Sequence, residues 1–385
     1  MSKEYGINNK KILYICYHNP FGTKGGGAMA SHAYLRAFSE LMDGALDLIC
    51  SSTLQIEDHS DIKCSDIIYV RERNWIRKFS SIFTGYMNRY VPFTKKWISK
   101  NHDKYQLVVF DHSNVSGPLV EYVNTYGLKS ITIHHNFERD FFKDNNKAIY
   151  KFLFLHHVIK WERTAYLKST LNLFLTMHDM NKFHDIYGIG KGKNDLIGVF
   201  EFEDYSTPKE YPRCEKKTFV ITGSLGVPQT IDAITYFFSD LYEYLPLESK
   251  VIVAGRKPSQ QIVKLCSKHQ NVELISDPAD MNEIVSQADI YLCATRTGGG
   301  LKLRIMDGLK NGLPVITHFC SARGFEIFEN EVFFKIYGTP LEFKKSVLEL
   351  MRLNNNKKEI QNIYKKHFSY EAGVNRLKKI LIAVH

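Results

Sequence analysis

The chain has 385 residues, of which 44% are hydrophobic and 24% charged, with a net charge of +10. This composition indicates a soluble globular protein, and the length suits two domains. No apolar run reaches the ~20 residues that span a bilayer, and seven cysteines without a Cys-x-x-Cys pair argue against a disulfide framework or a structural zinc site. The positive charge favours anionic partners, and no nucleic-acid-binding signature is present.

Strand-like and helix-like segments alternate along the whole chain, which predicts an α/β fold with parallel sheets. Residues 11–16 form the first predicted strand, and a glycine-rich loop leads from it into a helix over residues 28–41. Gly26 and Gly27 close that loop. Its backbone N–H groups can bind an anion, although the dinucleotide fingerprint Gly-x-Gly-x-x-Gly is missing.

Basic and large apolar residues interleave over residues 71–104. A helix with aromatic residues on one side and cations on the other can lie on an anionic membrane surface. Alternatively, these helices bury their aromatic residues in the first domain or bind an acceptor, and the sequence leaves all three interpretations open. Cys16, Cys50 and Cys293 each end an apolar run, which favours small core residues in a reducing cytoplasm. The protein would be either free in the cytoplasm or peripheral on the inner face of the membrane.

Two further predicted strands end in polar residues. The apolar run 107–110 is followed by Asp111 and His112, and the run 131–133 leads into a polar loop. Because ligands bind at the carboxyl ends of strands in open α/β sheets, Asp111 and His112 are candidate site residues.

The loop after residue 133 begins with two adjacent histidines. His135, Asn136 and Glu138 then offer an imidazole, an amide and a carboxylate, which suit sugar hydroxyls. Alternatively, one of His134 and His135 packs inward and the other polar residues cap the next helix. Residues 146–167 read as a long helix whose histidines pack or lie on the surface.

A polar segment with two prolines, residues 201–216, marks the linker to the second domain. A strand over residues 218–222 follows, and then Gly223 and Ser224 precede a helix. Arg256 follows the strand 251–254 and can supply a positive charge beside them.

The most specific stretch lies between residues 290 and 314. A buried strand, 290–294, is followed by Arg296, three glycines and an apolar periodicity that predicts a helix from Leu301. Lys302 and Arg304 fall in its first turn, where cations oppose the helix dipole unless an anion lies in front of them. The alternative is an ordinary amphipathic helix with surface cations.

This stretch resembles the donor-binding motif of retaining glycosyltransferases with the GT-B fold, the large family-4 group, in a variant that reads Arg-x-Gly-Gly-Gly-x-Lys. The resemblance implies that Arg296 and Lys302 hold the donor diphosphate and that Asp307 binds the ribose. It further implies that a donor site is completed by the glycines and the preceding loops: Gly223, Ser224, Arg256, Gly298, Gly299 and Gly300. The position of the leading glutamate of the better-known family pattern is Gly299 here.

The resemblance also implies a domain organisation of two Rossmann-like domains facing across a cleft. An acceptor-binding domain would span residues 1–200, a linker 201–216, a donor-binding domain 217–366, and a helix over 367–385 would cross back to the first domain. His112 would lie beside the donor sugar. Gly26, Gly27 and the loop of His135, Asn136 and Glu138, similar to a motif of surface-polysaccharide members, would bind sugar or acceptor.

The sequence thus predicts a metal-independent glycosyltransferase that moves a sugar from a nucleotide-diphosphate sugar to a saccharide or lipid-linked acceptor with retention. The chain has no Asp-x-Asp metal motif, so we expect no cofactor besides the donor substrate. Two alternatives share the fold: a nucleotide-sugar epimerase and a non-catalytic nucleotide-sugar binding subunit. The missing dinucleotide fingerprint disfavours an oxidoreductase.

Overall fold

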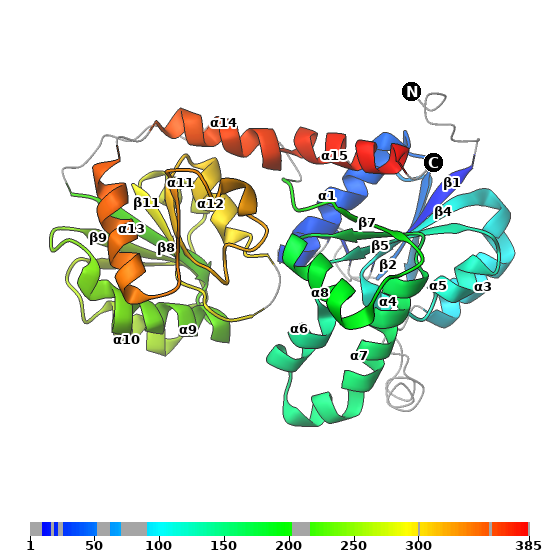
Figure 1. Ribbon diagram of the computed structural model, residues 1–385, viewed down its shortest axis with the longest axis horizontal. Coiled ribbons are helices and arrows are strands. Elements are labelled where there is room, and N and C mark those ends of the chain that lie inside the picture. The colour runs from blue at the N-terminus through cyan, green and yellow to red at the C-terminus, as the bar shows by residue number, and fades with distance from the viewer. Residues whose placement is uncertain are drawn as a thin grey trace. The chain divides into compact units, whose positions relative to one another are not determined.

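The structure is a computed structural model that describes residues 10–16, 19–21, 26–51, 62–70, 91–201, 216–298, 301–353 and 356–383. The chain divides into two compact units, residues 1–204 with 368–385, and residues 205–367 (Figure 1). Several predicted features lie outside the described residues: the loop 22–25, most of the basic and aromatic segment, the centre of the linker, Gly299 and Gly300.

The first unit contains a seven-stranded parallel sheet in the order β3-β2-β1-β4-β5-β6-β7. The strands are β1 Lys11–Cys16, β2 Leu46–Ser51, β3 Asp66–Val70, β4 Tyr105–Asp111, β5 Lys129–His134, β6 Leu171–Phe174 and β7 Lys193–Leu196. The central strands are nearly continuous apolar runs because helices cover both faces of the sheet.

Helices α3 and α5 pack on one face of this sheet, where Ile98 and Val123 join Leu13 and Phe110 in one core. Tyr14 points to the opposite face and contacts Phe38 of α1. The helices of the unit are α1 Gly26–Leu41, α3 Val91–Asn101, α4 Ser113–Ser116, α5 Val120–Asn124, α6 Glu138–Asn145, α7 Ala148–Lys168, α8 Met177–Tyr187 and α15 Tyr370–Ile382.

The C-terminal helix α15 belongs to the first unit. The Tyr370 hydroxyl donates to the Glu40 carboxylate at 2.9 Å, and the Arg376 guanidinium donates to the Val199 carbonyl at 3.3 Å. The absence of a side chain at Gly373 lets the helix approach Phe200 closely. The predicted return of the C-terminal helix to the first domain is therefore confirmed.

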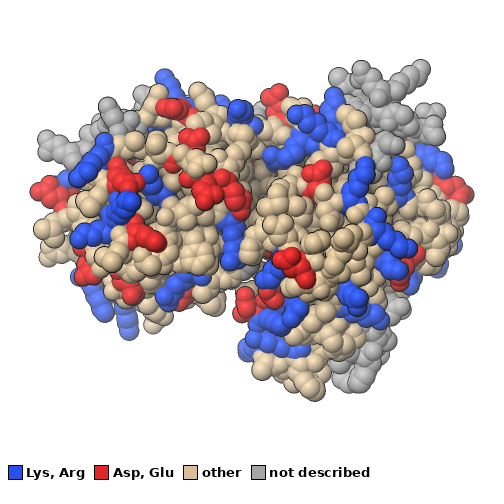
Figure 2. All heavy atoms as spheres, in the orientation of Figure 1, with Lys and Arg blue, Asp and Glu red and all other residues tan. Residues whose placement is uncertain are grey.

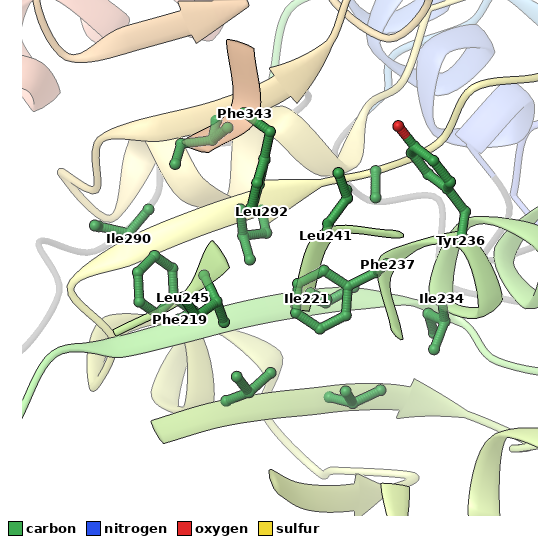
Figure 3. Packing of buried hydrophobic residues seen from close by; sticks show 14 of the residues in the cluster. Phe219, Ile221, Ile234, Tyr236, Phe237, Leu241, Leu245, Ile290, Leu292 and Phe343 are labelled. Atoms are coloured by element: carbon green, nitrogen blue, oxygen red, sulfur yellow. The ribbon is translucent and has the colours of Figure 1, made fainter. Parts of the chain in front are cut away.

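The second unit contains a six-stranded parallel sheet in the order β10-β9-β8-β11-β12-β13. The strands are β8 Thr218–Ser224, β9 Lys250–Arg256, β10 Val272–Ser276, β11 Ile290–Cys293, β12 Val315–His318 and β13 Phe334–Tyr337. Figure 3 shows the core on one face of this sheet, where Phe219 and Leu292 meet Phe237 and Phe343.

Helices α9, α10 and α13 contribute to that core, and α12 lies on the opposite face, where Gly308 packs tightly on Tyr291. The helices are α9 Pro228–Tyr236, α10 Gln260–Cys266, α11 Met281–Ser286, α12 Arg304–Lys310, α13 Pro340–Arg352 and α14 Lys357–Phe368, which runs into the first unit. Among the described residues, no helix is both long and apolar enough to cross a membrane.

The predicted helix start near Leu301 is wrong, because α12 begins at Arg304. Ile305 and Met306 donate their N–H groups to the carbonyls of Lys302 and Leu303, three residues back, so a tight turn precedes the helix. Lys302 therefore lies in this turn, whereas Arg304 is the first helical residue.

Candidate functional site

The first unit has a topological switch point between β1 and β4. The chain passes from β1 to β2 on one side, and β4 pairs with β1 on the other. At the carboxyl ends of these strands, the Cys16 thiol donates to the Asp111 carboxylate at 3.3 Å. Open α/β sheets bind ligands at this kind of edge.

An acid and an imidazole pair at that edge. His135, which follows β5, hydrogen-bonds to Asp111, and both side chains are buried. Burial alone would lower the pKa of His135, but the charge of Asp111 and the hydrogen bond to it raise the pKa. Burial likewise opposes ionisation of Asp111, yet the charge of His135 brings its pKa down to about 2. The contact between the two side chains therefore favours the imidazolium form of His135 and the carboxylate form of Asp111.

A second acid and imidazole lie beside the first pair. His112 has a φ of +124°, a strained conformation for a residue with a side chain. Its Nδ1 accepts the backbone N–H of Asn114, and its Nε2 lies 3.2 Å from a carboxylate oxygen of Glu138. Because Nδ1 accepts this hydrogen bond, the Nε2 atom carries the proton that faces Glu138.

Burial raises the pKa of the Glu138 carboxyl to about 7, against the lowering effect of a hydrogen bond from the Asn136 amide and the charge of His135. Glu162, on α7, also has a buried carboxyl, and burial raises its pKa to about 8. It accepts the Tyr187 hydroxyl at 2.7 Å. Two protonatable acids thus lie within the buried part of this unit.

The rings of His112 and His135 are stacked, with centroids 5.6 Å apart and an interplanar angle of 20°. His134 instead packs on Phe174 in an aromatic cluster, so of the two adjacent histidines it is His134 that points inward. The structure therefore brings together His112, His135, Asn136 and Glu138. Such a group can orient hydroxyls and exchange protons near neutral pH.

The two glycines assigned to this region lie at the start of α1. Gly26 is the first residue of α1, and Gly27 is exposed on the same helix, where a Cβ atom would point into open space. Their predicted contact with sugar or acceptor stays a prediction.

The second unit has its own switch point, between β8 and β11. Gly223 lies near the carboxyl end of β8, and a Cβ atom there would be 2.8 Å from the Arg304 guanidinium. That guanidinium donates to the Thr222 carbonyl and the Thr230 hydroxyl, both at 3.3 Å. Glycine at position 223 therefore makes room for a cation at this edge.

The glycine turn after β11 holds a buried lysine. Gly298 has a φ of +86°, which favours glycine, and it lies against the Gln229 side chain. The Lys302 ammonium donates to the Gly298 carbonyl at 3.4 Å. Burial lowers the pKa of Lys302, and the charges of Arg304 and Arg323 lower it further. Three cations therefore gather at one end of the sheet.

Arg296 forms an ion pair with Asp232 of the same unit. Its guanidinium makes two hydrogen bonds of 3.1 Å to the Asp232 carboxylate and lies 4.5 Å from the centre of the Tyr236 ring. About two-fifths of the Arg296 side chain remains exposed. An incoming anion would share this guanidinium with Asp232.

The remaining donor candidates occupy different places. Ser224 and Arg256 are exposed neighbours in register at the ends of β8 and β9. Asp307 lies on α12, 3.3 Å from the Lys310 ammonium. Within the described part of the chain, no three metal-ligating side chains lie close enough together to hold a metal ion.

The sequence of this second unit matches a known family. The family described as glycosyl transferases group 1 matches residues 216–352, which include the turn that holds Lys302. Residues 216–352 form a group 1 glycosyl transferase domain. This domain confirms the predicted family resemblance and enzyme class. A comparison with curated proteins found no match to the sequence of the chain.

Solved structures share the fold of this glycosyltransferase along nearly the whole chain. HepE from Anabaena in complex with UDP is 12% identical, with a TM-score of 0.64 over 97% of this chain and 100% of HepE. The lipopolysaccharide outer core galactosyltransferase WaaB is 12% identical, with a TM-score of 0.68 over 97% and 99%. A glycosyltransferase from Rickettsia africae is 10% identical, with a TM-score of 0.68 over 98% and 99%. The predicted GT-B fold class is therefore confirmed.

Several residues around these sites were not assigned from the glycosyltransferase sequence. Arg323 follows the end of β12, so its position after a buried strand was an available signal. Glu162 and Asp232 lie within helices α7 and α9, and no local pattern distinguishes them from solvated acids.

Proposed function

We propose that this glycosyltransferase moves a sugar from a nucleotide-diphosphate sugar to a saccharide or lipid-linked acceptor, with retention at the anomeric carbon, in the synthesis of a bacterial surface glycan. The observation that carries the proposal is the gathering of Lys302, Arg304 and Arg323 within the group 1 domain. Cations at the carboxyl edge of a parallel sheet suit a diphosphate.

The chemistry explains why these cations matter. Transfer breaks the bond between the anomeric carbon and the diphosphate, so negative charge develops on the leaving group. Preorganised cations stabilise that charge. Lys302, fixed by its bond to the Gly298 carbonyl, is the central contributor, with Arg296 beside it. Structures of HepE in complex with UDP and with UDP-glucose make UDP-sugars the first donors to test.

In this proposal, residues of the first unit position the acceptor. In the proposed step, the acceptor oxygen bonds to the anomeric carbon on the face that the diphosphate leaves, and the acceptor proton passes to a diphosphate oxygen. His112, with its strained backbone and its Nε2 facing Glu138, then positions the donor sugar, and His135 with Asn136 positions hydroxyls.

The test has two stages. A thermal-shift screen with uridine, guanosine, cytidine and thymidine diphosphate sugars identifies the donor. NMR of the product formed with a saccharide acceptor then gives the anomeric configuration, and we expect the donor's configuration to be kept. Inversion of configuration would overturn the retaining mechanism. Isomerised donor without acceptor would indicate an epimerase, and a thermal shift without turnover on any acceptor would indicate a binding subunit.

A further inference from the structure

A helical hairpin projects from the first unit. It consists of α6 and α7, joined at Asn146 and Lys147, and extends away from the sheet (Figure 1). No residue between positions 139 and 157 is buried. The base of α7, in contrast, is anchored by the buried Val158 and Glu162. The outer turns of the hairpin therefore contribute little to the core of the unit.

The outer turns of α7 expose large apolar side chains. Phe152 is 82% exposed, Ile149 is 59% exposed and Tyr150 is 51% exposed. Ile149 and Phe152 are three residues apart and lie on one face of the helix, while Tyr150 stacks on Phe154. Phe141 of α6 is also exposed. Apolar residues that gather on an exposed surface in this way mark an interaction site.

Cations accompany these apolar residues. Between positions 141 and 157 the chain has three lysines and a single acidic residue: Lys143, Lys147, Lys151 and Asp144. Helices α6 and α7 form one end of the first unit, and Figure 2 shows basic side chains near this end. This surface therefore has both apolar side chains that can insert into a lipid bilayer and lysines that attract negative charge.

We propose that the end of this hairpin, residues 141–155, docks on an anionic lipid bilayer. Ile149 and Phe152 enter the headgroup region, and the lysines lie over lipid phosphates. A second copy of the chain fits less well, because an isologous contact would bring the lysines of both copies together. The proposal is independent of the transfer reaction, and it concerns a different segment from the basic and aromatic residues 71–104.

The experiment is co-sedimentation of the full chain with vesicles of phosphatidylcholine, with or without phosphatidylglycerol. We expect binding to the anionic vesicles, weakened by salt. The double variant Ile149→Ser, Phe152→Ser should reduce binding by about ten-fold or more. Both side chains are exposed, so folding is preserved. The matched control is Ile189→Ser, an 85% exposed apolar residue of the same unit, which should bind as the wild type does.

The charge contribution is tested separately with Lys147→Glu, Lys151→Glu, which should lose the preference for anionic vesicles. Wild-type protein that stays in the supernatant, or a double apolar variant that sediments unchanged, would overturn the proposal. So would a wild-type dimer that the apolar variant converts to a monomer without lipid, because the second copy would then be the occupant. Each variant should keep the nucleotide-induced thermal shift, which separates failure of docking from failure of the donor site.

Discussion

The Glu162 carboxyl group accepts a hydrogen bond from the backbone N–H of Glu138. It also accepts the N–H of Arg139 at 3.3 Å. These N–H groups lie in the first turn of α6, where a helix has no internal acceptors, and the N-cap residue Phe137 offers none. Glu162 therefore caps α6 from another helix and fixes the residue that faces His112.

The first prediction concerns stability and pH. Burial raises the pKa of Glu138 to about 7 and that of Glu162 to about 8. At a pH above the ordinary glutamate pKa, these two carboxyl groups therefore bind protons when the unit folds. The contribution of these two carboxyl groups to the free energy of unfolding should therefore be largest at about pH 5. It should fall as the pH rises to about 8, because the folded unit then holds its protons less favourably. Glu162→Gln cannot lose a proton and should show a shallower fall, by up to about 1.4 kcal/mol per pH unit.

The measurement is urea unfolding followed by tryptophan fluorescence. All three tryptophans of the chain, Trp75, Trp97 and Trp161, belong to the first unit, so the signal reports on that unit alone. At about pH 5 the variant should lose only about 1 kcal/mol, because glutamine resembles the protonated acid and lacks one acceptor. Parallel slopes for wild type and variant would show that Glu162 does not titrate in this range.

The second prediction separates strain from function at His112. Glycine tolerates a φ of +124°, whereas alanine is strained there as histidine is. His112→Gly should therefore be about 1 kcal/mol more stable than His112→Ala. Both variants lack the imidazole and should lose transfer activity by roughly a hundred-fold, while the nucleotide-induced thermal shift is kept because His112 lies outside the group 1 domain.

Tryptophan-monitored unfolding and the transfer assay check these two expectations separately. Equal stability of the two variants would mean that the backbone at this position carries no strain. Activity within a few-fold of the wild type would remove His112 from the reaction.

Much of the fold was predictable because parallel strands are short apolar runs. The run at 290–294 corresponds to β11, and the polar residues after the runs at 107–110 and 131–133 meet because β4 and β5 are neighbours. The ends of these strands therefore predict His112 and His135 as candidate site residues.

Other features depended on contacts that sequence spacing does not encode. Which of His134 and His135 points inward depends on the register of β5, where a shift of one residue exchanges the two faces. The start of α12 is set by a tight turn that apolar periodicity does not distinguish from a helix. Glu162 and Asp232 act from helices on residues far away in the chain, 24 and 64 positions respectively.

The third prediction tests the cation cluster. Lys302→Ala removes a buried charge from beside Arg304 and Arg323, so transfer should fall by about a hundred- to a thousand-fold. The matched control is Lys264→Ala, which removes an exposed lysine from α10 of the same unit and should leave activity unchanged. Initial rates at saturating acceptor give the comparison. Activity of Lys302→Ala within a few-fold of wild type would reject its contact with the diphosphate.

The fourth prediction concerns the competition between Asp232 and the donor for Arg296. The two side chains are partly exposed, and such an ion pair is worth up to about 1 kcal/mol. If the donor diphosphate binds Arg296, it must share the guanidinium with Asp232. Asp232→Asn should then strengthen nucleotide-diphosphate binding by up to about five-fold. Isothermal titration with the nucleotide that gives the largest thermal shift measures the change.

A double-mutant cycle shows whether this effect passes through Arg296. In an Arg296→Ala background, Asp232→Asn should change affinity little, because the guanidinium for which Asp232 and the diphosphate compete is gone. An equal gain in both backgrounds would mean that Asp232 repels the donor directly. A loss of affinity in the Asp232→Asn single variant would mean the opposite of competition: Asp232 would then hold Arg296, above the Tyr236 ring, in the orientation that the donor requires.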